Sequence, residues 1–360
     1  MKEGDVIHGY RILEDFRVVG GMSKVTFAES EGKEYFIKEF LSPKYPTPDS
    51  PGSERIKAQK RKACDTFESH HRKINELIAT KVSLGGNLVY AVSFFREGPS
   101  YYKINEKIDT SSLSLKEISS LPFDRIITIA RSVCHSVGIL HGLNIVHGDL
   151  KPDNILIKET SRDNYTGKLI DFDDSYFSET PPSDRDRIVG TPEYYSPELA
   201  AYIMDEDEEI DGKTLTLASD IFTLGIIFCE YFTGEKPISG TSLPTWSAIA
   251  KGTKISFAKT INPEVDKLLR SMLSFNSDDR PSIKKIQNIL REIKEGRKSV
   301  EETFGAKHSG SSIRIRLGRG FKPTSSEMET DAAVSFSPIS DVSKSRKVGL
   351  RGKGLKIAEK

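Results

Sequence analysis

The chain has 360 residues and a formal net charge of +1, with 36% hydrophobic and 29% charged residues. This balance is typical of a soluble globular enzyme, and the length allows one large domain or two smaller ones with a tail. The near-zero net charge gives no electrostatic reason to expect a nucleic-acid or membrane partner.

The cysteines and the apolar segments bear on the cellular compartment. Cys64, Cys134 and Cys229 form no CxxC pair, which favours free thiols in a reducing compartment over a disulfide framework or a zinc site. No apolar run follows the first residues, and the most apolar stretch, Ile221 to Phe232, is shorter than the about 20 residues that span a bilayer. We therefore expect a cytoplasmic protein without a membrane span.

The first hundred residues are predicted to form mainly strands. A proline-rich loop from Ser42 to Pro51 and a polar stretch with helical spacing through Lys81 interrupt them. The strand candidates are runs rich in aromatic and β-branched residues, separated by glycines. They are Tyr10–Asp15, Lys24–Glu29, Tyr35–Phe40, Leu88–Arg96 and Tyr101–Ile108.

After Leu113 the apolar residues recur at helical spacing. The spacing predicts one helix through Ile126, Ile129, Val133, Val137 and Leu140. Further helices are predicted at Ser219–Phe232, Pro263–Phe275 and Ser282–Glu295. Strands followed by helices indicate an α+β architecture with two lobes.

The densest motif is His147-Gly148-Asp149-Leu150-Lys151-Pro152-Asp153-Asn154, ahead of an apolar run. It resembles the catalytic loop of the protein kinase family, H-x-D-L-x-x-x-N. The resemblance implies that Asp149 is the catalytic base for the attacking hydroxyl, that Lys151 contacts the γ-phosphate and that Asn154 is a Mg²⁺ ligand. The alternative is a polar turn between a helix and a strand.

A second motif, Asp171-Phe172-Asp173, stands where that family has its metal-binding D-F-G. The resemblance implies that Asp171 is the main Mg²⁺ ligand, since a hard cation prefers carboxylate oxygen. Asp173 replaces a glycine that normally leaves this backbone free to reorient. It could stiffen the segment or add a carboxylate near the metal.

Lys38 ends a run, Tyr35 to Lys38, that resembles the V-A-I-K strand of the family. A lysine in a half-buried strand needs a partner, because an unpaired buried charge is costly. The resemblance implies contact with the α- and β-phosphates of ATP and a pair with a helix glutamate. We expect that partner to be Glu76, with Glu68 as the alternative; either could instead be a solvated surface residue.

The nucleotide loop departs furthest from the family pattern G-x-G-x-x-G-x-V. Anchored on Val25, the register places Val18 and Ser23 at the first and third glycine positions, and only the central glycine remains, as Gly20 followed by Gly21. Backbone amides between Gly20 and Ser23 are still expected to cover phosphates, and a plain β-turn is the alternative. The same register suggests that Glu106 to Ile108 form the hinge that binds adenine.

Three later segments also resemble the family. Gly190 to Glu198 resembles G-T-x-x-Y-x-x-P-E and adds Thr191 to the expected catalytic residues, Asp220 begins a D-x-x-x-x-G segment, and Asp279-Arg280-Pro281 resembles the late D-R-P. The resemblance implies a buried Glu198–Arg280 ion pair and an Asp220 that braces the catalytic loop.

The resemblance covers about the first 300 residues and implies the two-lobed protein-kinase-like fold. Residues 1–108 would form a small antiparallel β-rich N-lobe that binds nucleotide, and residues 109–300 a larger helical C-lobe for catalysis and peptide binding. Residues 301–360 are rich in Ser, Gly and basic side chains. We expect them to be a flexible tail, and the alternative is a docking arm for a regulatory partner or for the acidic stretch Asp205–Asp211.

The expected function is that of a bacterial-type serine/threonine protein kinase using ATP and Mg²⁺ on protein hydroxyls. His147-Gly148-Asp149 also resembles the sequence of this loop in aminoglycoside and choline kinases, so one alternative is a small-molecule kinase. A second alternative is a pseudokinase, a scaffold without catalytic activity. The segment 190–198 favours a protein substrate.

In the family, an arginine at the position of Gly148 usually binds a phosphorylated residue of the activation loop. Because this chain has glycine there, we expect its activity to depend little on activation-loop phosphorylation. The candidate acceptors are Ser175, Tyr176, Ser178, Thr180 and Ser183.

Overall fold

The computed structural model describes residues 1–19, 23–81, 86–108, 111–161, 164–182, 185, 188, 190–204 and 210–296. The predicted tail, residues 301–360, and the glycine pair Gly20 and Gly21 lie outside the described residues. The expected boundary between the lobes at residue 108 and the expected start of the tail at 301 stay predictions.

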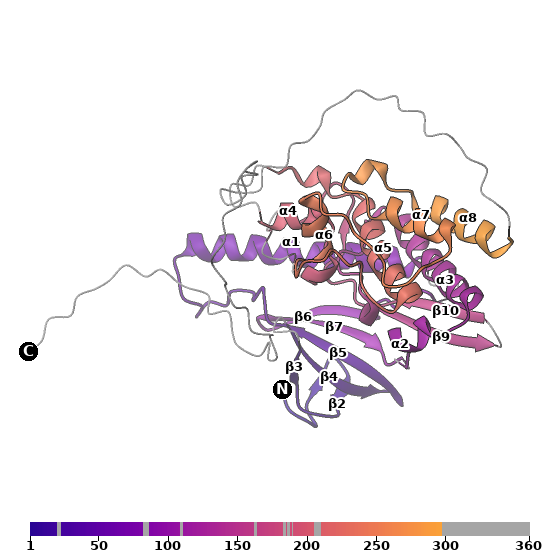
Figure 1. Cartoon of the computed structure of the whole chain (residues 1–360). Coiled ribbons are helices and arrows are strands. Elements are labelled where there is room, and N and C mark those ends of the chain that lie inside the picture. Colours follow the sequence, from indigo (N-terminus) through magenta and orange to yellow (C-terminus); the bar gives the residue numbers. More distant parts are fainter. Residues whose placement is uncertain are drawn as a thin grey trace, which may run out of the picture. The chain divides into compact units, whose positions relative to one another are not determined.

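A seven-stranded antiparallel sheet forms the N-terminal lobe (Figure 1). Its order is β1-β2-β4-β5-β7-β6, and β3 pairs with β4 off this path. The inner face buries an apolar cluster that includes Ile12, Ala28, Ile37 and Ile104. The strands are β1 (Val6–Ile7), β2 (Tyr10–Ile12), β3 (Arg17–Val19), β4 (Ser23–Ser30), β5 (Lys33–Phe40), β6 (Ser93–Glu97) and β7 (Ser100–Glu106).

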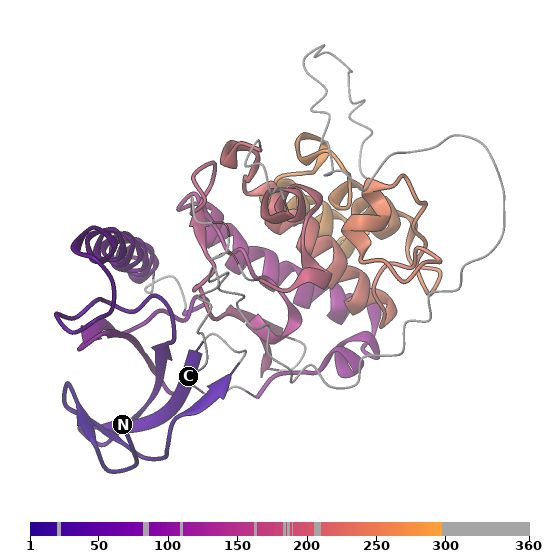
Figure 2. The ribbon, with the colours of Figure 1, turned by 90° about the vertical axis from the view of Figure 1, so that its left-hand side faces the viewer.

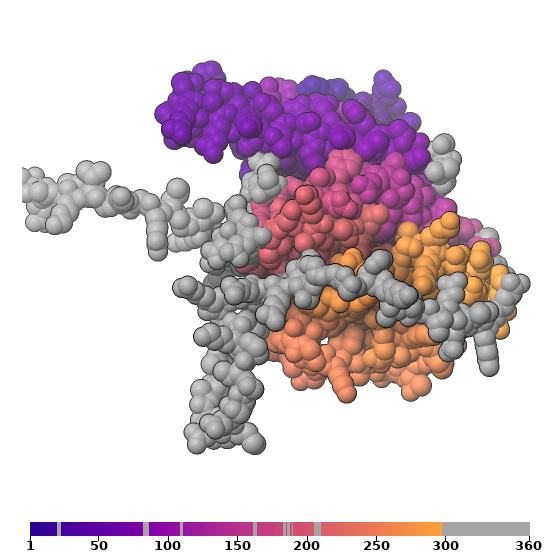
Figure 3. Space-filling model, turned by 90° about the horizontal axis from the view of Figure 1, so that it is seen from above, coloured from indigo at the N-terminus to yellow at the C-terminus, as the bar shows by residue number. Residues whose placement is uncertain are grey.

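One long helix, α1 (Glu54–Ala79), lies beside this sheet (Figure 2). It begins at the cap Ser53, whose side chain accepts a hydrogen bond from the Ile56 amide. Cys64 packs with the aromatic side chains of the sheet, while Ile74 belongs to the core of the helical lobe. The inward face of α1 therefore contacts both lobes, and its other face carries exposed charged side chains. Figure 3 shows α1, in purple, at the surface of the molecule.

The C-terminal lobe is mainly helical and buries the largest apolar cluster of the described chain. At its centre α5 is buried along its whole length. The helices are α2 (Leu115–Ser119), α3 (Phe123–His141), α4 (Pro197–Met204), α5 (Ala218–Thr233), α6 (Thr245–Ala250), α7 (Pro263–Met272) and α8 (Ile283–Lys294). Two antiparallel pairs accompany them: β8 (Ile145–Val146) with β11 (Tyr176–Phe177), and β9 (Ile155–Ser161) with β10 (Asn164–Leu169).

The α+β, two-lobed prediction is confirmed, and the main predicted helices are present with small shifts at their ends. The predicted strand Leu88–Arg96 is wrong in its first half. Leu88 instead forms a parallel bridge to Leu169, at the end of β10, and only β6 joins the sheet. The apolar run is thus divided between the two lobes, which periodicity cannot reveal because it does not specify the partner that each half pairs with.

Among the helices that the structure describes, none has both the length and the apolar character that crossing a bilayer requires.

Candidate active site

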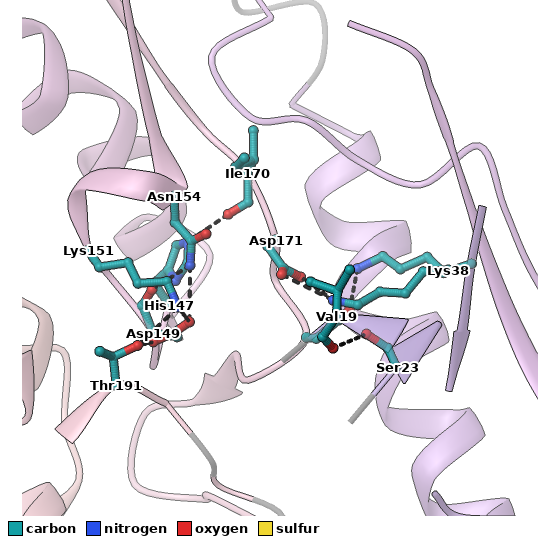
Figure 4. Close-up of polar contacts among 12 residues, drawn as sticks. Val19, Ser23, Lys38, His147, Asp149, Lys151, Asn154, Ile170, Asp171 and Thr191 are labelled. Atoms are coloured by element: carbon teal, nitrogen blue, oxygen red, sulfur yellow. Dashed lines mark hydrogen bonds and ion pairs between the residues drawn. The ribbon is translucent and has the colours of Figure 1, made fainter. Parts of the chain in front are cut away.

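The three predicted catalytic side chains lie together around the carboxylate of Asp149 (Figure 4). Thr191 donates its hydroxyl to Oδ1 of Asp149 at 2.8 Å, and Lys151 donates Nζ to Oδ2 at 2.7 Å. Lys151 also donates to the Thr191 hydroxyl oxygen at 2.9 Å. The closed triangle holds an acceptor carboxylate beside a cation, which suits a group that receives a proton next to a developing anion.

Asn154 is the last residue of the short 3₁₀ turn Pro152–Asn154, which directly follows Lys151 in the chain. Its amide nitrogen donates to the Asp149 backbone oxygen at 2.8 Å and to the Asp149 carboxylate at 3.1 Å. Because the nitrogen makes these bonds, the amide oxygen Oδ1 is the atom that remains suitable for a cation.

Asp171 lies next to Asn154 through backbone hydrogen bonds. The amide of Ile170 donates to the Asn154 carbonyl at 3.1 Å, and the ring of His147 bonds the Ile170 carbonyl at the same distance. The side chain of Asp171 is 42% exposed, and its φ of 59° lies in the strained left-handed region. The Asp171 carboxylate contacts Lys38 at 3.1 Å. Carboxylate and amide oxygens are the protein ligands that suit Mg²⁺, which completes its shell with phosphate and water oxygens.

No group of three or more His, Cys, Asp or Glu side chains within the described residues could hold a metal ion without other ligands.

Asp220, in the first turn of α5, is 2% exposed and braces the catalytic loop. Its carboxylate accepts from the amide of His147 at 2.8 Å and from the ring of His141 at 2.9 Å. The expected bracing by Asp220 is therefore confirmed. The expected buried pair is confirmed too, since Arg280 donates Nη1 and Nη2 to the two oxygens of Glu198 at 2.6 and 2.8 Å.

Gly148 has a structural reason to be glycine. Its φ is +80°, and a Cβ built on it would lie 2.2 Å from the carbonyl oxygen of Asp174. No L side chain fits that space without moving backbone. The arginine that the family usually places before the catalytic aspartate is therefore excluded by the path of the chain after Asp171.

Lys38, on β5, does not form the predicted pair with Glu76. Its Nζ lies 3.1 Å from the nearer oxygen of Asp171 and 2.5 Å from Oδ2 of Asp173. The reason is the rotation of α1: Glu76 follows the inward-facing His71 by five residues, about 140° around the helix, and is exposed. Glu68, the alternative partner, pairs with Arg72 at 2.9 Å.

Two residues of this cluster escaped the sequence analysis. Lys103 on β7 donates Nζ to Oδ1 of Asp173 at 2.6 Å. His71 is buried beside the cluster, where burial lowers the pKa of its ring to about 3. The signal for Lys103 was its place between Tyr102 and Ile104 in the middle of a predicted strand, because a lysine buried there needs an oppositely charged partner.

The charges of the cluster support one another. Burial alone would disfavour the ammonium of Lys38, but Asp173 and Asp171 outweigh it and raise the pKa of that lysine above its usual value. Burial likewise opposes ionisation of Asp173, but Lys103 and Lys38 hold the pKa of its carboxyl well below its usual value. Both partners are therefore charged at neutral pH.

The predicted nucleotide loop is described only at its edges. Val18 in β3 is 60% exposed, whereas Ser23 and Val25 in β4 are 5% and 4% exposed. Val25 stands opposite Lys38 across the β4–β5 pairing. Gly20 and Gly21 lie outside the described residues, so their contact with phosphates stays a prediction.

The predicted hinge follows the sheet strand next to Lys38. Glu106 ends β7, opposite Tyr35 of β5, and Ile108 is half-buried two residues later. Adenine binding by this segment stays a prediction.

The candidate phosphorylation acceptors differ in accessibility. Ser175 is 1% exposed and donates its hydroxyl to the His147 carbonyl at 2.9 Å, and Tyr176 is fully buried. Neither presents its hydroxyl to an incoming enzyme. Ser178 and Thr180 are at least partly exposed, and Ser183 lies outside the described residues.

Comparison with known proteins agrees with this fold. The protein kinase domain family matches residues 53–290, which is more than half of the chain. The chain therefore belongs to the protein kinase family. The matched range begins after Lys38, so the strands around the altered nucleotide loop fall outside it.

Individual relatives carry related names. The chain is 30% identical over 196 residues to serine/threonine-protein kinase PknA of Corynebacterium glutamicum, covering 52% of this chain and 39% of that protein. It is 27% identical to serine/threonine-protein kinase PkaA of Streptomyces coelicolor over 58% of this chain and 37% of that protein. The human phosphorylase b kinase gamma catalytic chain, liver/testis isoform, is 35% identical over 39% of this chain and 30% of its own length. The match thus spans less than half the length of each of these relatives.

Proposed function

We propose that this protein is a serine/threonine protein kinase that transfers the γ-phosphoryl group of Mg-ATP to hydroxyl groups of other proteins. The observation that carries the proposal is the hydrogen-bonded group of Asp149, Lys151 and Thr191, with Asn154 and Asp171 adjoining it. A proton acceptor, a cation and two oxygen ligands for Mg²⁺ are the parts that phosphoryl transfer needs.

Each side chain has a proposed task. Asp149 would orient the attacking hydroxyl and accept its proton, and Lys151 would place its ammonium against the γ-phosphate. Thr191 would hold both in position through its two hydrogen bonds. Lys38 would contact the α- and β-phosphates. Mg²⁺, held by Asp171 and Asn154, would supply positive charge to the phosphate oxygens.

Protein hydroxyls are favoured over small molecules by the segment after the site. The segment from Gly190 to Glu198 contains Thr191 and continues into α4. The buried ion pair between Glu198 and Arg280 fixes its end in the helical lobe. A rigid segment beside the catalytic group suits an extended peptide. The bacterial relatives named as serine/threonine-protein kinases support the same substrate class.

Gly148 supports an activation that does not depend on phosphorylation of the segment after Asp171. No arginine stands before Asp149 to receive a phosphoryl group, and two of the five candidate acceptors are buried. We expect turnover to persist when Ser178, Thr180 and Ser183 are changed to alanine. Loss of turnover in that triple variant, with the fold intact, would contradict this part of the proposal.

The proposal extends to location and partners. The three cysteines are free thiols and all are buried, as suits a cytoplasmic enzyme. Residues 301–360 are proposed as a segment through which a regulatory partner acts.

The central test is transfer of radiolabelled phosphate from ATP to generic proteins and, in parallel, to aminoglycosides. We expect protein labelling, lowered at least about 100-fold by Asp149→Asn. Asp124→Asn, an exposed carboxylate at the start of α3, is the matched control and should leave labelling unchanged. Labelling of aminoglycosides alone would support the small-molecule alternative, and no labelling despite ATP binding would support a pseudokinase.

A further inference from the structure

Two lysines face each other inside the N-terminal sheet. Lys38 of β5 and Lys103 of β7 are direct cross-strand partners in the antiparallel register, so both side chains point to the same side of the sheet. Their side chains are only 17% and 11% exposed. Like charges in this position repel, and burial strengthens the repulsion. The arrangement needs a shared negative charge.

Asp173 supplies that charge. One oxygen lies 2.6 Å from Nζ of Lys103 and the other 2.5 Å from Nζ of Lys38, and the side chain is 13% exposed. Asp173 occupies the third position of Asp171-Phe172-Asp173, where the sequence motif of the family has glycine. Asp173, which stands where the family motif has glycine, and the buried Lys103 thus form a pair.

The helix offers no carboxylate in this place. Toward the cluster, α1 presents His71, whose ring packs among aromatic side chains, with centroids 5.3 Å from Phe94 and 4.2 Å from Phe67. Glu68 and Glu76 line an open hollow on the outer surface of α1 with Arg72 and neighbouring polar residues. Neither glutamate belongs to the buried cluster around Lys38.

We propose that Asp173, balanced by Lys103, is the positioning residue that holds Lys38 for the nucleotide phosphates, in place of a carboxylate on α1. The inference rests on the proposed function and deepens it. It also means that the orientation of Lys38 is tied to the segment that carries the metal ligand Asp171, only two residues away, and not to the position of α1. A shift of α1 would leave Lys38 engaged.

The test uses a background in which folding is protected. Asp173→Asn alone would leave two buried ammonium groups facing each other, with only the Asp171 carboxylate in contact with Lys38, so the variant could fail to fold. Lys103→Met removes one of these charges and keeps the Lys38–Asp173 pair. The ATP affinity and turnover of Lys103→Met are measured first and serve as the reference for the second substitution.

Adding Asp173→Asn to Lys103→Met should weaken ATP binding at least about tenfold, since a charge-assisted contact is lost. The KM for ATP should rise and kcat fall, while the KM for the protein substrate stays unchanged. Asp173→Glu in the same background should recover part of the loss. If Asp173 had a purely structural role, Asp173→Asn would lower thermal stability without raising the KM for ATP selectively.

Matched variants on α1 complete the test. Glu76→Gln and Glu68→Gln should each leave the ATP affinity unchanged. The proposal is overturned if either of them weakens ATP binding as much as Asp173→Asn does, or if Asp173→Asn has no effect in the Lys103→Met background. ATP binding is measured by calorimetry without phosphoryl transfer, so a protein that binds ATP but labels no substrate would contradict the proposed function alone.

Discussion

At the scale of single residues, Gly148 shows how backbone geometry limits chemistry. Its positive φ and the Asp174 carbonyl leave no space for a side chain, so the motif His-Gly-Asp follows from the path of the chain. The resemblance of this motif to that of small-molecule kinases is therefore no argument for a small-molecule substrate.

Gly148→Ala should lower the free energy of unfolding by more than the roughly 1–3 kcal/mol that a strained backbone conformation costs, because the new Cβ also meets backbone. Gly98→Ala is the matched control: its φ is +57°, but nothing lies within 4 Å of the place that its Cβ would occupy. Urea unfolding of both variants measures the difference. Equal losses would show that the contact with Asp174 adds nothing.

His71 should make stability depend on pH. Its pKa is about 6.5 in the unfolded chain and about 3 in the fold, so between these values the unfolded chain binds a proton that the folded chain excludes. Stability therefore falls as pH is lowered through this window, by roughly 1.4 kcal/mol for each pH unit.

We expect His71→Phe, which suits the aromatic surroundings, to reduce the loss of stability between about pH 6.5 and pH 5. His135→Gln, at an exposed position of α3, is the matched histidine variant for comparison. Urea unfolding at several pH values measures both slopes. The explanation fails if the slope of the His71 variant matches that of the natural protein.

At the scale of elements, the active-site segments are held by a few buried polar contacts between parts distant in sequence. Glu198 at the start of α4 and Arg280 ahead of α8 lie 82 residues apart and form a bidentate pair that is almost fully buried. Such a pair fixes geometry more than it adds stability, but breaking it leaves a buried charge without its partner.

Glu198→Gln should therefore lower the free energy of unfolding by about 3–5 kcal/mol. Asp266→Asn breaks an exposed pair with Arg270 on α7 and should cost less than about 1 kcal/mol. Thermal and urea unfolding of the two variants give the comparison. Similar costs for both would mean that burial does not decide the contribution of these pairs.

At the scale of the whole molecule, residues before 297 already supply the proton acceptor, the cations and the buried pair on which the candidate site rests. Removing residues 301–360 should therefore leave ATP affinity and turnover on generic proteins within about twofold. The truncated and full chains are compared in the same labelling assay. A large change in either quantity would favour the alternative, in which the tail acts on the kinase lobes or recruits a partner.

Much of the site could be predicted because its residues are close in sequence. Asp149, Lys151 and Asn154 lie within six positions, so a single loop brings them together, and Asp220 and the Glu198–Arg280 pair follow from the motifs around them. The partner of Lys38 was not predictable in this way. It depends on the rotation of α1 and on the register between β5 and β7, neither of which periodicity specifies.

The amino-acid sequence alone determined the two-lobed architecture and the family to which the chain belongs, since both depend on local patterns of apolar residues and on short motifs. Only the tertiary structure decided which charges meet. Lys38 and Lys103 are 65 positions apart and become neighbours through strand pairing, and Asp173 reaches both from the other lobe. Charge pairing acts through distance in space, and that distance exists only once the chain has folded.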